Sequence, residues 1–166
     1  IAIALANRLS DSVVEAWDVS SEAIEVAREN AQINQVKIDF RQKDILKSLS
    51  ATENQFDVIV SNPPYVRDVE KELMKSNVLE YEPHVALFVE DDDPLLFFRA
   101  IARFAIKNLV AGGMLFFEIN RDFGDATKEL LAGYGFEQME VRKDLSGNSR
   151  MVKAVKPVGF SQESMA

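Results

Sequence analysis

The sequence predicts an α/β domain whose sheet is mainly parallel and ends in one antiparallel hairpin. Segments with strand and helix patterns alternate from the start of the chain to Gly135, as they do in parallel sheets. Two strand-like segments then follow each other across a short loop, which indicates a hairpin. The β-branched run 56–61 also has the composition of a buried parallel strand.

The first part of the chain alternates two helical patterns with three strand patterns. Ser20 is a common helix-capping residue type, and Asn34 closes the helix that Ser20 begins. We expect Trp17 to lie in the core. The buried stripe of the Ser20 helix is predicted to consist of Ala23, Val26, Ala27 and Ala31. The expected elements are a helix over 1–9, a strand over 13–18, a helix over 20–33, and strands over 36–41 and 56–61.

The second part begins with an irregular polar stretch over residues 66–93. Pro94 suits the first position of a helix that faces inward with Phe97, Ile101 and Ala105. The pair Gly112–Gly113 is predicted to be a turn. The remaining expected elements are a helix over 94–109, a strand over 114–119, a helix over 125–132, and strands over 136–143 and 150–155 joined at 146–148.

Composition limits the classes of site that the chain could hold. With 166 residues and 47% hydrophobic content, it has enough apolar material for one core. We expect a cytoplasmic domain over residues 1–156 and a flexible tail over 157–166. No cysteine and a single histidine argue against thiolate or histidine metal sites. The acidic run 91–93 precedes a predicted helix, whose dipole favours acids without a metal ion. We therefore predict no metal.

The charge balance bears on the type of substrate. The chain has 19 basic and 27 acidic residues, which give a net charge of −8. Lys and Arg supply most of the affinity of proteins for phosphate backbones, so this balance disfavours a nucleic-acid substrate. A local basic patch could still oppose the net charge.

The tetrapeptide Asn62-Pro63-Pro64-Tyr65 directly follows the predicted strand 56–61. Open α/β sheets bind ligands at the carboxyl ends of their strands. Two prolines stiffen the turn and leave carbonyl groups available as acceptors, while Asn62 adds an amide and Tyr65 a flat ring. This combination suits a planar group that carries an NH2. A plain Asn-Pro turn is the simpler alternative.

Together with further motifs, the tetrapeptide resembles the release factor glutamine methyltransferase family. The other matching segments are Tyr81-Glu82-Pro83, Ala86-Leu87, the stretch 92–101, Gly112-Gly113, Glu118-Ile119, and Asp144-Leu145-Ser146-Gly147 with Arg150. The resemblance implies a Rossmann-like class I fold and methylation of a glutamine side chain in a translation release factor. Exocyclic-amine methyltransferases that act on adenine in DNA or RNA share the tetrapeptide and remain an alternative. The segment 120–123 departs from the family pattern, which has a glycine and later a glutamine there.

The resemblance also implies roles for individual residues, with S-adenosyl-L-methionine as the cofactor. Asn62, Pro63 and Tyr65 would be catalytic, and Pro64 would join them in binding the substrate. Asp18 fits an acceptor for the ribose hydroxyls, because an acid at a strand end has that role in dinucleotide folds. Asp44 would accept from the adenine amino group, Ile45 would line the base, and Asn62 would also contact the cofactor.

All seven glycines lie at or beyond Gly112, although a nucleotide-type cofactor needs a glycine loop near the first strand. In the family that the chain resembles, such a loop comes just before a helix like residues 1–9. We therefore expect the first strand and this loop to precede Ile1. A binding scaffold without activity is the alternative.

Overall fold

The computed structural model describes residues 1–47, 55–64, 66–67, 88–89 and 93–159. The chain divides into two compact units, Ile1–Ser48 and Leu49–Ala166.

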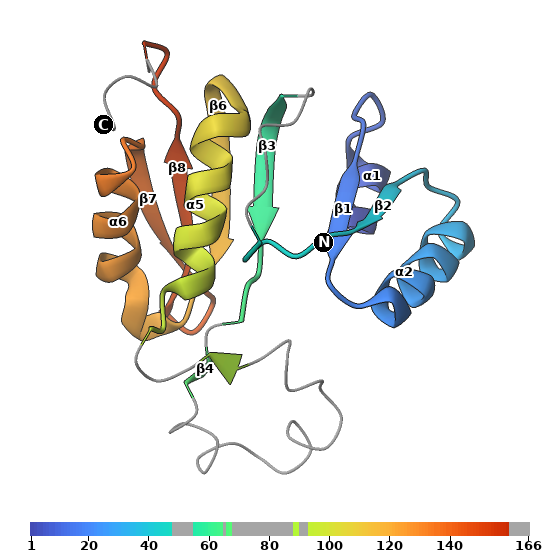
Figure 1. Ribbon diagram of the computed structural model, residues 1–166, viewed down its shortest axis with the longest axis horizontal. Coiled ribbons are helices and arrows are strands. Elements are labelled where there is room, and N and C mark those ends of the chain that lie inside the picture. The colour runs from blue at the N-terminus through green and yellow to red at the C-terminus, as the bar shows by residue number, and fades with distance from the viewer. Residues whose placement is uncertain (48–54, 65, 68–87, 90–92, 160–166) are drawn as a thin grey trace. The chain divides into compact units, whose positions relative to one another are not determined.

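The first unit contains two helices and a parallel pair of strands (Figure 1). The chain order is α1 (Ala2–Arg8), β1 (Glu15–Asp18), α2 (Ser21–Ile33) and β2 (Asp39–Gln42). β1 pairs with β2 in parallel, with Glu15 opposite Asp39 and Asp18 opposite Gln42. The predicted order of elements is confirmed. The second strand begins three residues later than the sequence pattern indicates.

Helix α2 begins and ends where the sequence predicts. Ser20 Oγ accepts a hydrogen bond from the Ala23 backbone N–H at 3.1 Å. Asn34 is the C-cap residue at the other end of the helix. The predicted buried stripe is wrong in part, because Ala23 is exposed and Val26 is 57% exposed. Ile24 and Ala31 are buried instead. Helical periodicity places these two residues on one face with Ala27.

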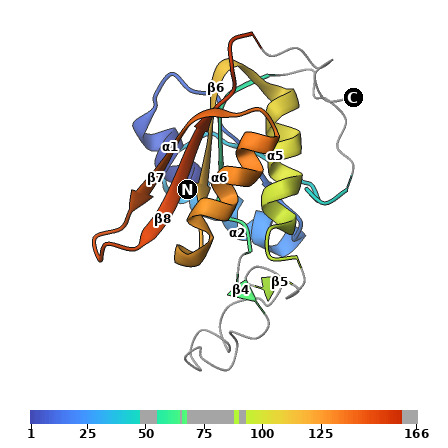
Figure 2. The same cartoon turned by 90° about the vertical axis from the view of Figure 1, so that its left-hand side faces the viewer.

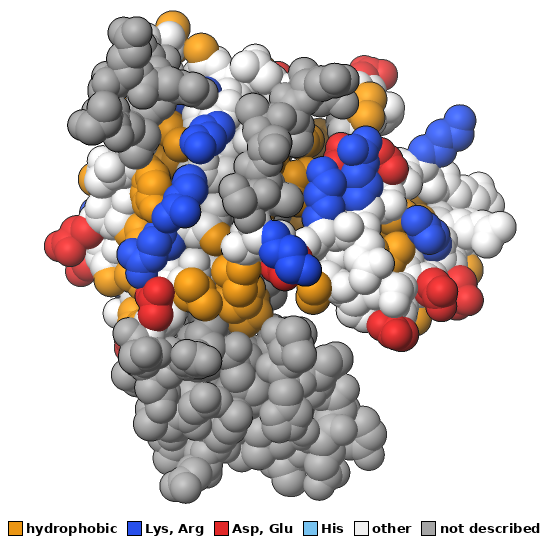
Figure 3. Space-filling model, viewed as in Figure 1, with side chains coloured by type: hydrophobic (Ala, Val, Ile, Leu, Met, Phe, Trp, Pro, Cys, Tyr) orange, Lys and Arg blue, Asp and Glu red, His pale blue; other side chains and the backbone are white. Residues whose placement is uncertain are grey.

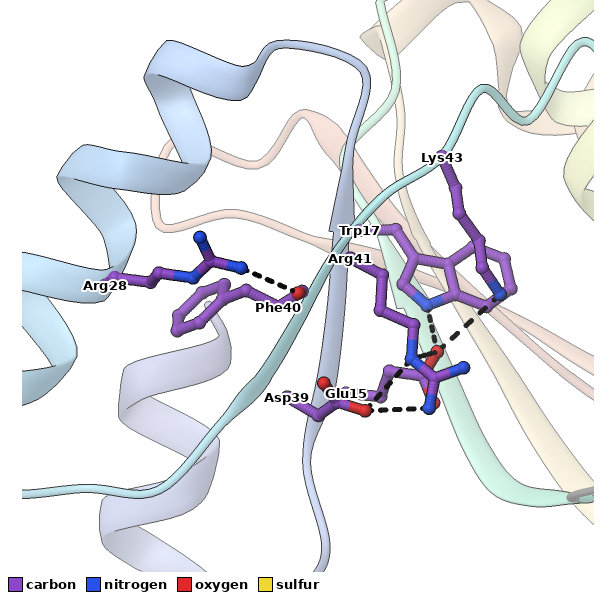
Figure 4. Close-up of polar contacts among 7 residues, drawn as sticks. All are labelled: Glu15, Trp17, Arg28, Asp39, Phe40, Arg41 and Lys43. Carbon is purple, nitrogen blue, oxygen red and sulfur yellow. Dashed lines mark hydrogen bonds and ion pairs between the residues drawn. The ribbon is translucent and has the colours of Figure 1, made fainter.

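A polar cluster joins β1 to β2 on one face of the pair (Figure 4). Glu15 accepts from the Trp17 indole N–H and forms ion pairs with Arg41 at 3.1 Å and Lys43 at 3.8 Å. The Lys43 ammonium lies 3.8 Å from the centre of the Trp17 ring. Trp17 is therefore half-buried in a charged cluster, and its predicted core position is wrong. The cluster ties residues of both strands together and fixes their register.

The second unit contains a mixed four-stranded sheet in the order β3-β6-β8-β7. β3 pairs with β6 in parallel, and β8 pairs in antiparallel fashion with both β6 and β7. These pairings confirm the predicted parallel strands and the hairpin. A short parallel pair, β4 with β5, stands apart from this sheet. The elements are β3 (Phe56–Ser61), β4 (Val66–Arg67), β5 (Phe88–Val89), α5 (Leu96–Asn108), β6 (Leu109–Glu118), η2 (Arg121–Phe123), α6 (Gly124–Gly133), β7 (Glu137–Lys143) and β8 (Ser149–Val155).

The glycine pair lies inside β6 and is not a turn before it. Gly112 has φ +77°, and the β3 to β6 register shifts between Phe56 and Val58, which marks an irregularity in the ladder. The Lys156 side chain donates to the Leu109 carbonyl at 2.7 Å, and its backbone pairs with Gly112 and Gly113. Pairing with Lys156 therefore continues the strand through the two glycines, between the β3-paired residues Leu109 and Met114.

Helices α5 and α6 lie side by side on one face of this sheet (Figure 2). Phe98 of α5 is fully buried. Its ring packs edge-on against the Phe117 ring, with 5.0 Å between the two ring centres. The predicted inward residues Ile101 and Ala105 are buried, whereas Phe97 is only half-buried and Phe98 takes the core position. Pro94 precedes the helix by two residues. This core holds the strands whose ends carry the candidate site.

Candidate functional site

The segment Asn62–Pro64 emerges directly from the carboxyl end of β3. Ser61, the last residue of the strand, is paired with Phe117 of β6. Pro63 is buried, Pro64 is half-buried and Asn62 is exposed. No residue of the described ranges forms a hydrogen bond with the Asn62 amide. The turn is therefore held by its backbone and prolines while the amide is presented outward. Tyr65 lies outside the described residues.

Two other segments of the same unit end at this edge of the sheet. β6 runs parallel to β3 and ends at Glu118, and the Ile119 N–H donates to the Arg150 carbonyl at 2.9 Å. Lys143 of β7 is paired with Ser149 of β8, so the turn between these strands also lies at this edge. Residues from three distant parts of the sequence thus lie along the same edge of this sheet.

The β7–β8 turn is organised by one carboxylate. Asp144 accepts from the backbone N–H groups of Ser146 at 2.9 Å and Asn148 at 3.0 Å, and from the Arg150 guanidinium at 3.3 Å. The pKa of Asp144 is lowered mainly by the hydrogen bond from the Asn148 N–H. The hydrogen bonds from Ser146 and Arg150 lower it further. Gly147 has φ +84°, a conformation that favours glycine. The turn is therefore well fixed.

In the first unit, the carboxyl ends of β1 and β2 form a separate edge that carries acidic side chains. Asp18 is exposed, and its Oδ1 accepts from the Ser20 N–H at 2.9 Å. The Lys43 N–H donates to the Asp18 carbonyl at 2.9 Å, and the Gln42 side chain donates to the Val19 carbonyl at 2.9 Å. These bonds hold the segment after β2 beside the end of β1.

Asp44 and Ile45 lie directly after this junction. Asp44 Oδ1 accepts from the Leu46 N–H at 3.0 Å, and Oδ2 lies 3.6 Å from the Lys47 ammonium. Ile45 is half-buried. The edge thus offers two carboxylates and an apolar side chain, a set that can accept hydrogen bonds from hydroxyl or amino groups and cover a flat ring.

Comparison with known proteins shows which proteins this chain is similar to. Residues 1–81 match the methyltransferase small domain family. The chain is 51% identical to the release factor glutamine methyltransferase of Flavobacterium psychrophilum, across 92% of the chain and 53% of that protein. It is 41% identical to the enzyme of the same name from Bacteroides thetaiotaomicron, across 93% of the chain and 55% of that protein.

This chain is a homologue of release factor glutamine methyltransferases. It spans about half the length of these curated relatives. Among solved structures, a methyltransferase from Pyrococcus furiosus matches it with a TM-score of 0.66 and 21% identity, across 93% of the chain and 68% of that protein. The fold is therefore that of the class I, S-adenosylmethionine-dependent methyltransferases.

In this methyltransferase homologue, the structure groups the predicted site residues by unit. Asp18, Asp44 and Ile45 share one edge of the first unit. Asn62, Pro63 and Pro64 share an edge of the second unit with the β7–β8 turn. Sequence reasoning noticed Asp144 and Arg150 only as part of the family resemblance. It missed their contact, because an ion pair across a turn leaves no periodic signal.

The homologue also carries a row of basic residues that the net charge conceals. Figure 3 shows Lys and Arg side chains over α5. This helix bears Arg99, Arg103 and Lys107 at intervals of four residues, which places them on one face. Arg99 is paired with Asp93 at 2.6 Å. A local basic surface therefore exists on an acidic chain.

The part of the chain that the structure describes lacks two kinds of feature. No group of three or more His, Cys, Asp or Glu residues there could hold a metal ion. No helix there is long and apolar enough to cross a membrane.

Proposed function

We propose that this protein is a cytoplasmic methyltransferase that transfers a methyl group from S-adenosyl-L-methionine to the side-chain amide of a glutamine in a translation release factor. The observation that carries the proposal is the exposed Asn62 amide on a turn anchored by the buried Pro63. The names of the homologous proteins support the glutamine substrate. Residues 1–156 would form the methyltransferase domain.

The role of Asn62 follows from the chemistry of the substrate amide. An amide nitrogen is a weak nucleophile because its lone pair is delocalised into the carbonyl. The Asn62 side-chain oxygen and the Pro63 carbonyl can each accept one N–H of the substrate, which orients the nitrogen and favours its developing tetrahedral form. The nitrogen then loses a proton to solvent after transfer, so no strong base is needed beside it. Tyr65 and Pro64 would complete the substrate pocket.

The first unit contains residues that fit the cofactor. When bound, S-adenosyl-L-methionine supplies an electrophilic methyl group. Asp18 is exposed, and only its Oδ1 bonds to a residue of the described ranges, so Oδ2 can accept from ribose hydroxyls. Asp44 can accept from an amino group, and the half-buried Ile45 can pack against the adenine ring. Asn62 would also contact the cofactor.

A nucleic-acid exocyclic amine is the second candidate substrate, and the basic row on α5 favours it. Arg103 and Lys107 are exposed and form no ion pair with another described residue, so they could contact phosphates. The net charge of −8 and the homology favour the protein substrate.

The test is a methyl-transfer assay with labelled cofactor. The purified chain is incubated separately with a release factor and with duplex DNA, and any product is digested to locate the label. Label on a glutamine of the release factor supports the proposal. Label on adenine would select the nucleic-acid alternative, and the absence of label on both, with the cofactor still bound, would indicate a binding scaffold.

A further inference from the structure

The β7–β8 turn lies at the same edge of the sheet as Asn62, yet methyl transfer as proposed does not use it. Ser61, the last residue of β3, is paired with Phe117, one residue before the end of β6, and β8 begins beside the end of β6, with Met151 opposite Glu118. Figure 1 shows this turn and the end of β3 at the same end of the sheet. A macromolecule that brings a side chain to Asn62 would therefore approach the turn as well.

The turn is rigid enough to act as a preformed contact. Asp144 binds the Ser146 and Asn148 N–H groups, and its own N–H donates to the Asn148 carbonyl at 2.8 Å. Arg150 holds the same carboxylate from β8. A segment that is already ordered loses little conformational entropy when a partner binds.

Leu145 projects from this fixed turn into solvent. Its side chain is fully exposed, and its neighbours in the turn are polar. A single exposed leucine on a mobile loop would need no explanation. Here the hydrogen bonds around Asp144 hold the backbone that carries it. An apolar side chain on a rigid projection can fill a pocket on a partner protein.

A charged hollow of about 280 Å³ adjoins the turn. Its lining includes Lys143 and Ser149, the two residues that flank the turn. Its other charged residues are Arg121, Lys128, Asp122 and Asp125, so basic residues outnumber acidic ones. Arg121 is paired with Asp122 at 3.6 Å. Neither Lys128 nor Lys143 forms an ion pair with any residue that the structure describes, so both can bind a carboxylate from outside.

We propose that the β7–β8 turn and this hollow form a docking surface for the glutamine-bearing protein substrate. Leu145 would enter an apolar pocket on that protein, while Lys128 and Lys143 would bind an acidic side chain beside the pocket. This inference rests on the proposed function. It adds a contact that holds the folded substrate and is separate from the atoms that orient the amide.

The test measures binding and turnover of a folded release factor with four variants. Leu145→Ala and Lys143→Glu alter the surface. Val158→Ala and Lys37→Glu are matched controls, since both residues are exposed, Val158 follows β8 at the opposite end of the sheet, and Lys37 belongs to the first unit. We expect Leu145→Ala to weaken binding by about tenfold, which is typical of an apolar anchor, and to raise KM more than it lowers kcat. Lys143→Glu should weaken binding and reduce its dependence on salt.

The outcomes separate this inference from the proposed chemistry. Unchanged affinity and KM in both surface variants would overturn the docking surface, even if the wild type methylates the release factor. If both variants lose binding but the wild type transfers no methyl group, the surface stands and the proposed reaction fails. Equal losses in the Val158→Ala control would show a general effect on folding and would also overturn the inference.

Discussion

Asp144 and Arg150 are joined across the β7–β8 turn by two hydrogen bonds of 3.3 Å, from Nε and Nη2 of the arginine to one carboxylate oxygen. The other oxygen accepts from two backbone N–H groups. One side chain therefore closes the turn and links it to β8, the strand that borders the end of β6.

Acid should weaken this turn. The N–H of Asn148, then that of Ser146 and Arg150, hold the pKa of Asp144 below its ordinary value. A lowered pKa in the folded state adds stability above the unfolded value of about 3.9, and that stability is lost as pH falls through the folded pKa. Asp144→Asn should therefore be less stable than wild type at pH 7 and approach it in acid. Urea unfolding of wild type and Asp144→Asn, at pH 7 and at acidic pH, measures the difference in their free energies of unfolding. Asp11→Asn is the control. An equal difference at both pH values would contradict the prediction.

Replacing Asn62 by alanine should abolish most methyl transfer and spare cofactor binding. Loss of one preorganised hydrogen bond to the reacting group lowers kcat by about a hundredfold. Gln55→Ala is the matched control, because Gln55 is an exposed amide just before the other end of β3. Single-turnover assays and calorimetry with the cofactor separate the two effects. Near-normal turnover by Asn62→Ala would refute the proposed role of this residue.

Asp18→Asn should weaken binding of S-adenosyl-L-methionine. The asparagine oxygen can still accept from the Ser20 N–H, so the start of α2 is preserved while the negative charge is lost. A hydrogen bond to a charged group contributes about 1.5 to 3 kcal/mol, which predicts a loss of affinity of at least about tenfold. Titration calorimetry of wild type, Asp18→Asn and the Asp11→Asn control tests this. Equal affinities in all three would remove Asp18 from the cofactor site.

Gly113→Ala should destabilise the second unit through a steric clash. A Cβ at Gly113 would lie 2.9 Å from the Val110 carbonyl oxygen and 3.2 Å from that of Asp57. Overpacking of this kind costs about 1 to 3 kcal/mol. Outside its own helix turn, a Cβ at Gly133 would have no atom of a described residue within 4 Å, so Gly133→Ala serves as a tolerated control. Denaturant unfolding of both variants measures the difference, and comparable stabilities would show that the strand relaxes around the added methyl group.

Local patterns in the sequence predicted the elements that carry the site. The run 56–61 matches β3 at both ends, and the strand-end positions of Asp18 and Asn62 follow from the alternation of strands and helices. Long-range contacts explain the errors. Gly112–Gly113 has the composition of a turn, but backbone pairing with Lys156 keeps it in a strand.

Side-chain environments were harder to predict than elements. Several alanines in α2 give its faces similar hydrophobicity, so the pattern missed Ile24. Trp17 is drawn into a polar cluster by Glu15 of β1 and by Lys43, which directly follows β2. The predicted roles of Tyr65 and of the segment 81–83 fall on residues outside the described ranges, and they remain predictions, as does a glycine loop preceding Ile1.

Among the described strands, β3 has β6 as its only partner, whereas β6 is paired on both sides. Backbone N–H groups along a strand point alternately to its two sides, so some of those in β3 point away from β6. Opening of β3 thus breaks one ladder, while displacement of β6 would break two. The strand that presents Asn62 should consequently show faster amide exchange than β6. Within the described part of the chain, the position of Asn62 therefore depends on the ladder that Val58 to Ser61 of β3 form with β6.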